Sequence, residues 1–234
     1  MTLLSIVQSA ATKIGIPQPA TIVGNSEPQV ETLLTFANEE GEELARMGQW
    51  EEITVEKTFT AVAAAEQTGA LPSDFIAFVN DSFYNRTNRR KVFGPISAQE
   101  WQREQAISVA AGIHDFFRVR GGEILMTPNP TVGDTMAFEY VSKNWVDTDA
   151  DGVGDSAVWV SDTDTSVLEE RLLSLGIVWR FLQKSGLPFQ APHQIYMSEV
   201  QKALGRQGGA PTLSLDGGGG IFLGPPNVPE TGFG

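Results

Sequence analysis

The spacing of apolar residues changes twice along this chain, and this change limits the possible folds more than any other feature. Apolar residues recur at helical spacing over about residues 1–48 and again over about residues 166–206. Between them, about residues 52–146 are rich in Thr, Val and Phe at strand-like spacing, and Gly121 and Gly122 are placed to turn a hairpin. The sequence therefore predicts an α+β fold in which N- and C-terminal helices form a helical bundle, with a small, mostly antiparallel β-sheet insertion and an extended C-terminal arm.

Local signals assign the ends of the first two helices. The first helix is expected from Leu3 to Ile14, because Gly15 follows and favours a helix end. A second helix is expected from Pro28 to about Met47. Its acidic residues are expected mostly to face water: Glu39, Glu40, Glu42 and Glu43.

Two capping-box patterns mark further helix starts. In such a box, a Ser side chain and a Glu three residues later each bind a free backbone N–H of the first turn. Ser97 with Glu100 is expected to begin a helix over about residues 97–111. Ser166 with Glu169 is expected to begin the strongest helix of the chain.

Composition narrows the functional classes. The chain has 234 residues, 41% of them apolar, which suits a sizeable domain with a buried core. Its formal net charge of -13 disfavours a protein that grips nucleic acid, since most of the surface would repel phosphates. The absence of cysteine excludes disulfides, thiolate metal sites and cysteine nucleophiles. The N-terminus lacks a basic segment and no window reaches about 18 continuous apolar residues, so a soluble chain with no membrane partner is expected.

The composition shifts at the end of the chain. Residues 1–206 are expected to form the folded domain, whereas residues 207–234 are crowded with Gly and Pro and are not expected to form a packed helix or strand. The terminal segment still carries too many apolar side chains for an ordinary solvated tail: Leu213, Leu215, Ile221, Phe222, Leu223, Val228 and Phe233. An extended arm that becomes ordered by docking on a neighbouring subunit is expected, and a disordered end or a cloning remnant is the alternative.

An acidic loop over residues 147–164 carries the clearest candidate metal ligands: Asp147, Asp149, Asp151 and Asp155. With Gly152 among them, they match the first part of an EF-hand-like calcium loop, in which several hard oxygens converge on a tight turn. The twelfth position of such a loop holds Val158 in place of the usual glutamate, so Asp162 or Asp164 would have to supply the distal carboxylate. A structural calcium ion that orders the loop is one interpretation. A solvated acidic turn, with Asp164 helping to cap the next helix, is the other; no further cofactor is expected.

Catalytic patterns are sparse. The two histidines, His114 and His193, lie far apart and belong to no metalloprotease motif or nucleophile elbow, so structural roles are expected for both. Four glycines at 217–220 lack the lysine, strand and helix of a phosphate-binding loop. Carboxylates are numerous, but their spacing singles out no pair for hydrolysis. One basic cluster is expected to contact a protein or stay solvated: Arg86, Arg89, Arg90 and Lys91.

Several passages together resemble the head-to-tail adaptor proteins of tailed bacteriophages, the head completion or tail tubular protein A-like family. They are EEGEELARMGQW, ALPSDFIAFVNDSFYNRTNRRKVFGPISAQEW, the strand MAFEYVSKNWV and the segment DTDTSVLEERLLSLGIVWRFLQKSGLP. The likeness covers most of residues 1–206. It implies a ring, usually of twelve subunits, that binds beneath the portal, extends the DNA channel and carries tail or nozzle proteins.

The resemblance predicts a structural virion protein and not an enzyme. Its partners would be the portal protein, neighbouring copies in the ring, a tail or nozzle protein, and DNA that passes through without sequence-specific binding. It would be assembled in the host cytoplasm and lie at the head–tail interface of the virion. The aspartate loop departs from the family pattern, in which a plainer turn is expected. Two alternatives stay open: a calcium-dependent protein-binding module, and a carboxylate-based peptidoglycan hydrolase of a phage tail.

Overall fold

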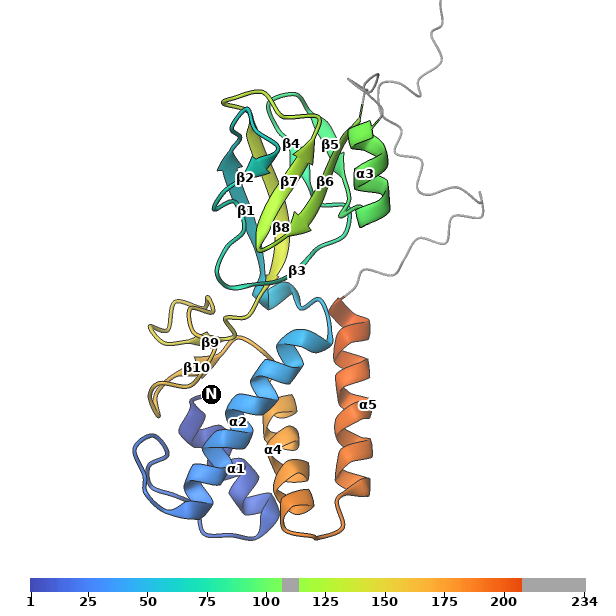
Figure 1. The fold of residues 1–234 in the computed structure, drawn as a ribbon. Helices are drawn as coiled ribbons and strands as arrows, with labels where there is room; N and C mark the ends of the chain where they lie inside the picture. The colour runs from blue at the N-terminus through green and yellow to red at the C-terminus, as the bar shows by residue number, and fades with distance from the viewer. Residues whose placement is uncertain (107–113, 208–234) are drawn as a thin grey trace, which may run out of the picture.

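The computed structural model describes residues 1–106 and 114–207, which form two bodies placed end to end (Figure 1). The helical body, at the bottom of Figure 1, consists of α1 (Leu3–Ile14), α2 (Pro28–Met47), α4 (Glu170–Lys184) and α5 (Gln190–Gln207). The sheet body above it consists of a curled sheet and α3 (Ala98–Ala106). A short 3-10 turn, η1 (Glu51–Ile53), leads from α2 into the sheet. None of the described helices is long and apolar enough to cross a membrane.

The helix α4 is the centre of the helical body, because α1, α2 and α5 all pack against it. Its buried residues occupy several sides of the helix, as expected for a helix enclosed by others: Leu172, Leu173, Ser174, Gly176, Ile177, Val178 and Phe181. The helix α1 begins at Thr2, whose side chain accepts a hydrogen bond from the Ser5 N–H (3.4 Å). It ends, as predicted, at Gly15, which has the left-handed conformation (φ 85°).

The main sheet has eight strands in the described residues, in the order β1–β8–β4–β5–β6–β7–β2, with β3 also paired to β8. Their bounds are β1 (Thr54–Thr60), β2 (Glu66–Gln67), β3 (Phe75–Phe78), β4 (Tyr84–Asn85), β5 (Arg90–Phe93), β6 (Asp115–Arg120), β7 (Glu123–Thr127) and β8 (Thr135–Ser142). The longest pairing joins β1 to β8 in antiparallel register, from Thr54 opposite Val141 to Thr60 opposite Thr135. The strands β5 and β6 run parallel.

The predicted fold class is wrong. A helical bundle with a small, mostly antiparallel insertion was expected, whereas the chain is rich in β-structure and forms a large, curled, mixed sheet. The strands β2 and β4 are two residues long, too short for an alternating pattern to show in the sequence. The parallel pair arises because the connection from β5 to β6 contains α3, and a helical crossover brings two strands side by side in the same direction.

Two predictions that depend on residues close in the sequence agree with the structure. Glu100 N donates to Ser97 Oγ (3.2 Å) and Ser97 N donates to Glu100 Oε2 (2.9 Å), which is the predicted capping box. The helix that it begins is described to Ala106, and its predicted end near residue 111 lies outside the described residues. The predicted hairpin is confirmed, since Gly121 and Gly122 turn between β6 and β7 with φ of 63° and 81°.

The second predicted capping box is wrong. Glu169 is itself the N-cap of α4, and Ser166 lies earlier in a two-residue strand, β10 (Thr165–Ser166). Ser166 Oγ instead accepts a hydrogen bond from Leu168 N (3.1 Å). Pairing of β10 with β9 (Val146–Asp147) holds Ser166 in an extended segment, so its hydroxyl cannot reach the third residue of α4.

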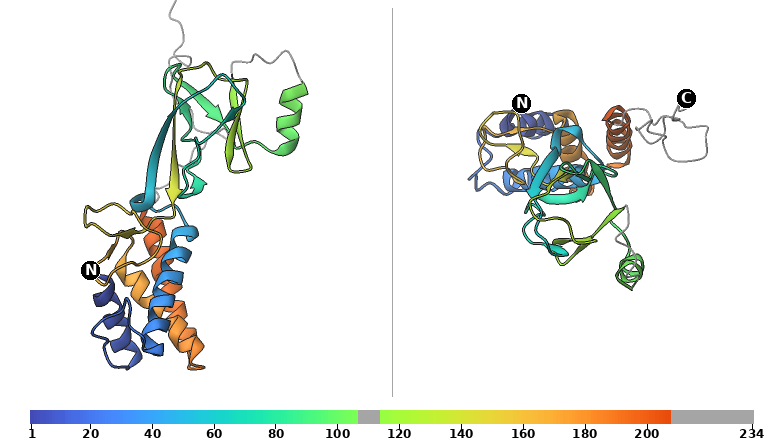
Figure 2. Two further views of the ribbon diagram at one scale, coloured as in Figure 1. Left: turned by 60° about the vertical axis from the view of Figure 1, so that its left-hand side comes forward. Right: turned by 90° about the horizontal axis from the view of Figure 1, so that it is seen from above.

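Each body has a hydrophobic core of its own. The core of the sheet body is aromatic: Phe83 lies with its ring centroid 4.8 Å from that of Phe117 and 5.4 Å from that of Phe138. The two cores meet within β8, because Tyr140 belongs to the sheet core and Val141 to the helical core. Successive strand residues point to opposite faces, so one strand serves both cores. Figure 2 shows β1 and β8 descending from the sheet to the helical body.

Candidate functional site

The acidic loop projects from the side of the helical body, between β9 and β10 (Figure 1). Asp147, its first aspartate, is buried, and its carboxylate accepts hydrogen bonds from Ala150 N (2.7 Å) and Gly152 N (2.9 Å). Thr165 Oγ1 donates to the same carboxylate at 3.4 Å. Desolvation acts in the opposite direction, but the N–H groups of Gly152 and Ala150 hold the pKa of Asp147 below its ordinary value. This aspartate therefore organises the turn.

Three of the four predicted calcium ligands lie together. One carboxylate oxygen each of Asp147, Asp149 and Asp151 lies within 4.8 Å of the others. The negative charge of Asp151 raises the pKa of Asp149, as expected where carboxylates crowd. Asp155 instead accepts hydrogen bonds from Thr148 N (3.1 Å) and Thr148 Oγ1 (2.5 Å). Hard oxygens at this spacing around a turn suit calcium, so the three clustered residues fit that ion.

The two distal aspartates have other partners. Asp162 accepts hydrogen bonds from Ile22 N (3.0 Å) and Val23 N (2.7 Å), and so fixes the loop between α1 and α2. Asp164 is buried and accepts from Val160 N (2.8 Å) and Ser161 N (2.7 Å) within its own turn. Neither residue completes the predicted ligand set, and Asp164 does not cap α4, whose N-cap is Glu169.

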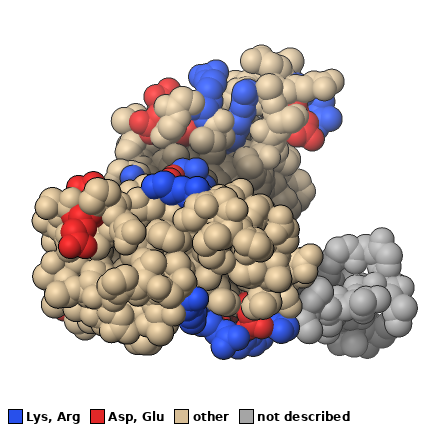
Figure 3. Space-filling view, turned by 90° about the horizontal axis from the view of Figure 1, so that it is seen from below, with Lys and Arg blue, Asp and Glu red and all other residues tan. Residues whose placement is uncertain are grey.

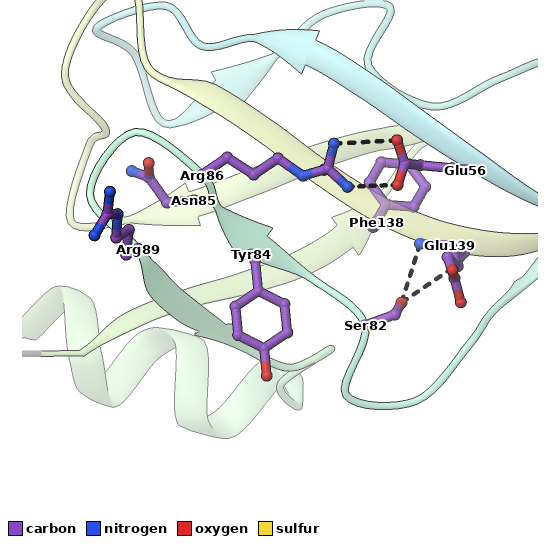
Figure 4. A pocket seen from close by; sticks show the side chains of 9 residues that line it. Glu56, Ser82, Tyr84, Asn85, Arg86, Arg89, Phe138 and Glu139 are labelled. Carbon is purple, nitrogen blue, oxygen red and sulfur yellow. Dashed lines mark hydrogen bonds and ion pairs between the residues drawn. The ribbon is translucent and has the colours of Figure 1, made fainter. Parts of the chain in front are cut away.

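The predicted basic cluster lies on the sheet body, beside a pocket of about 470 Å³ (Figure 4). Arg86 and Arg89 both line this pocket, together with Tyr84, which is 40% exposed. Arg86 forms a two-pronged ion pair with Glu56 of β1. Arg90 begins β5, next to the pocket strand β4. The residues that line the pocket are Glu56, Ser82, Tyr84, Asn85, Arg86, Arg89, Ala137, Phe138 and Glu139.

The other cation of this cluster, Lys91, is paired. Its Nζ lies 2.7 Å from an Asp81 carboxylate oxygen and 5.4 Å from the centre of the Phe93 ring. Both histidines have aromatic neighbours: His114 lies edge-on to Phe93 (5.3 Å between ring centroids) and His193 edge-on to Trp179 (4.9 Å). These contacts agree with structural roles for the histidines.

A buried ion pair between α2 and α4 was missed by the sequence analysis. Glu40 was expected to face water but is 0% exposed, and its Oε2 accepts from Arg180 Nε at 2.9 Å. Arg180 also bonds to Glu43. Burial raises the pKa of Glu40, while the Arg180 charge opposes that rise. The signal was present in the spacing, because Glu40 lies three residues after Ala37 and four before Leu44, both buried.

A cluster of charges on the flank of the helical body was also missed. Glu199 of α5 lies 2.8 Å from Lys202 Nζ and 3.3 Å from Arg171 Nε of α4, and Arg206 lies nearby. Lys13 of α1 donates to Ser174 Oγ (2.8 Å), and burial followed by repulsion from Arg171 lowers its pKa. Viewed from the helical end, Lys and Arg atoms gather at one edge of the body (Figure 3). The fold brings these residues together from three helices, so no local pattern marks them.

The predicted docking arm lies almost wholly outside the described residues, which end at Gln207, and so do all its apolar side chains. Gln207 itself is held at the end of α5. Its side chain accepts a hydrogen bond from Glu51 N (3.0 Å) and donates to the Glu52 carboxylate (2.7 Å). The point from which the arm departs is therefore fixed near the end of α2.

Comparison with known proteins gives one informative result. Residues 1–218 match the family described as SU10 adaptor protein, and this range includes every described element of both bodies. No curated protein matches the chain. The protein therefore belongs to the SU10 adaptor protein family, a family of bacteriophage adaptor proteins.

Proposed function

We propose that this protein assembles as a ring, of about twelve copies as is usual for head-to-tail adaptors, beneath the portal of a tailed bacteriophage. The ring extends the DNA channel and serves as the attachment platform for a tail or nozzle protein. The observation that carries the proposal is the family match over residues 1–218. The chain is then a virion component of the head–tail interface, assembled in the host cytoplasm, and its role is structural and not enzymatic.

The charge and shape of the chain support this role. A net charge of -13 lets DNA pass a channel wall without being held by it, so no sequence-specific contact with DNA is needed. The two bodies lie end to end (Figure 2), which gives a subunit two ends for axial partners and flanks for neighbouring copies. Arg86, Arg89 and Arg90 on the sheet body and the apolar residues of the arm are the surfaces that we assign to protein partners.

Light scattering tests the proposal. The mass of the purified chain is measured alone and with the portal protein, and the measurement is repeated with a chain truncated after Gln207. The expected result is a low-mass chain alone and a portal-sized complex in the mixture, with the complex lost on truncation. If the full chain forms no assembly with a portal ring at any ratio, the proposal is wrong.

We also propose that Asp147, Asp149 and Asp151 bind a structural calcium ion. Their clustered oxygens support this, as does the hydrogen bonding of Asp147 to the turn, which leaves the loop already shaped. The ion would stabilise the loop in this shape at the rim of the helical body. It would take no part in chemistry.

A further inference from the structure

A groove of about 530 Å³ lies where the helical body meets the sheet body. Its walls come from α2, from β3, from the segment between β8 and β9 and from the acidic loop, and its apolar lining is Ala45, Phe75, Ile76, Trp145, Ala157 and Val158. Phe75 packs against the sheet core and Ile76 against the helical core. The groove therefore follows the junction between the two cores.

The rim of the groove is apolar and carries one available cation. Val158 is 51% exposed although it borders the groove. Arg46 is paired with Glu42 at 2.6 Å, whereas Lys143 is exposed and forms no ion pair among the described residues. An occupant of this groove should therefore be apolar and should carry a negative charge.

The end of this chain has that composition. Residues 207–234 contain no Lys or Arg, and a single aspartate, Asp216, lies between the apolar pair Leu213 and Leu215 and the apolar run 221–223. Gln207 is bonded to Glu51 and Glu52, directly after the helix whose last turns form one wall of the groove. Six residues from Gln207 to Leu213 span up to about 20 Å when extended.

We propose that, before assembly, this groove receives residues 213–223 of the chain to which it belongs. Apolar side chains of the segment cover the lining, and Asp216 pairs with Lys143. A short tether gives the segment an effective concentration in the millimolar range, which favours its own groove over that of another molecule. The inference rests on the proposed role of the segment as a docking element, and it adds where that element is held while no partner is present.

Cross-linking of the unassembled chain tests the placement. A photoreactive phenylalanine analogue at Val158 is expected to cross-link to peptides from residues 213–223 in the full-length chain. In a mixture of ¹⁵N-labelled and unlabelled protein, both halves of each product should carry the same label. The same analogue at Val132, which is 69% exposed on the connection from β7 to β8, is the matched control and should give no such product. The proposal is overturned if the analogue at Val158 cross-links only to segments other than residues 213–223. It is also overturned if the products join only differently labelled chains.

A charge exchange tests the chemistry. Lys143→Glu is expected to reduce the Val158 cross-link several-fold, and Asp216→Lys added to it should restore the yield; Lys57→Glu on β1 should change nothing. All of these measurements are made without a portal, so they can succeed even if ring assembly fails, and the reverse also holds.

Discussion

At the scale of single residues, Glu40 of α2 forms a buried ion pair with Arg180 of α4. Glu40 is 0% exposed and the Arg180 side chain is 14% exposed, so removing the arginine leaves a carboxylate buried without its counter-charge. We expect Arg180→Ala to lower the free energy of unfolding by about 3 kcal/mol at pH 7, measured by urea denaturation. Arg171→Ala is the matched control, because Arg171 is 62% exposed, and its loss should cost less than about 1 kcal/mol.

The same pair should show a defined dependence on pH. Burial raises the pKa of Glu40 in the folded state, so the folded state binds a proton more readily than the unfolded state. The contribution of Glu40 to the free energy of unfolding therefore falls as pH rises from the ordinary carboxyl pKa through the raised one. In Arg180→Ala this slope should steepen, because the opposing charge is gone, and the deficit against the wild type should shrink as pH is lowered. Adding Glu40→Gln should abolish the extra slope; if the slope persists, Glu40 is not its source.

The aspartates of the acidic loop give a second prediction at this scale. Titration calorimetry should detect calcium binding to the full chain, weakened at least tenfold by Asp149→Asn, since one carboxylate ligand of three is lost. Binding should also weaken as pH falls, because Asp149, whose pKa the Asp151 charge raises, must lose its proton to bind the ion. Asp162→Asn removes the same charge from a residue bonded to Ile22 and Val23, and should leave the affinity unchanged. If the wild-type chain gives no heat of binding when calcium is added, the proposed calcium site is wrong.

At the scale of elements, two glycines set how closely the elements pack. A Cβ on Gly41 of α2 would overlap the Trp145 ring, and one on Gly176 of α4 would overlap the Glu40 carboxylate. These glycines allow the close approach that buries Trp145 and Glu40. The helix α2 is therefore held on both sides by residues that lie far from it in the sequence.

Alanine substitutions at Gly41 and Gly205 separate the effect of packing from the effect of helix propensity. Gly41→Ala should lower the free energy of unfolding by about 1–3 kcal/mol, because the added methyl group overpacks a rigid ring. Gly205→Ala in α5 meets nothing within 4 Å and should instead stabilise the protein by about 0.5–1 kcal/mol, since alanine is the better helix former. Thermal denaturation of both variants gives the comparison. An equal gain in stability in both variants would mean that the approach of α2 to Trp145 is not tight.

At the scale of the whole molecule, the two cores should respond separately to mutation. Phe117 lies in the core of the sheet body and Leu172 in that of the helical body. Phe117→Leu should increase amide hydrogen exchange chiefly in β4 to β7, and Leu172→Ala chiefly in α1, α2, α4 and α5. Exchange in β8 should respond to both, because Tyr140 and Val141 belong to different cores. Uniform acceleration over the whole chain by either variant would indicate a single cooperative unit.

What the sequence determined by itself is local. The end of α1 at Gly15, the capping box of Ser97 with Glu100, and the hairpin at Gly121 and Gly122 each depend on residues within a few positions of one another, so pattern and conformation coincide. The resemblance to phage adaptors also rested on the sequence, and the family match agrees with it at the level of an adaptor.

What only the tertiary structure decided depends on partners far along the chain. The pairing of β5 with β6, the burial of Glu40 against Arg180, and the binding of Asp162 to the loop after α1 join segments separated by many residues. Short strands and single charges carry too little pattern to show which distant segment they meet. Their position is set by packing around two cores, since a polar group is buried only where the fold supplies its partner.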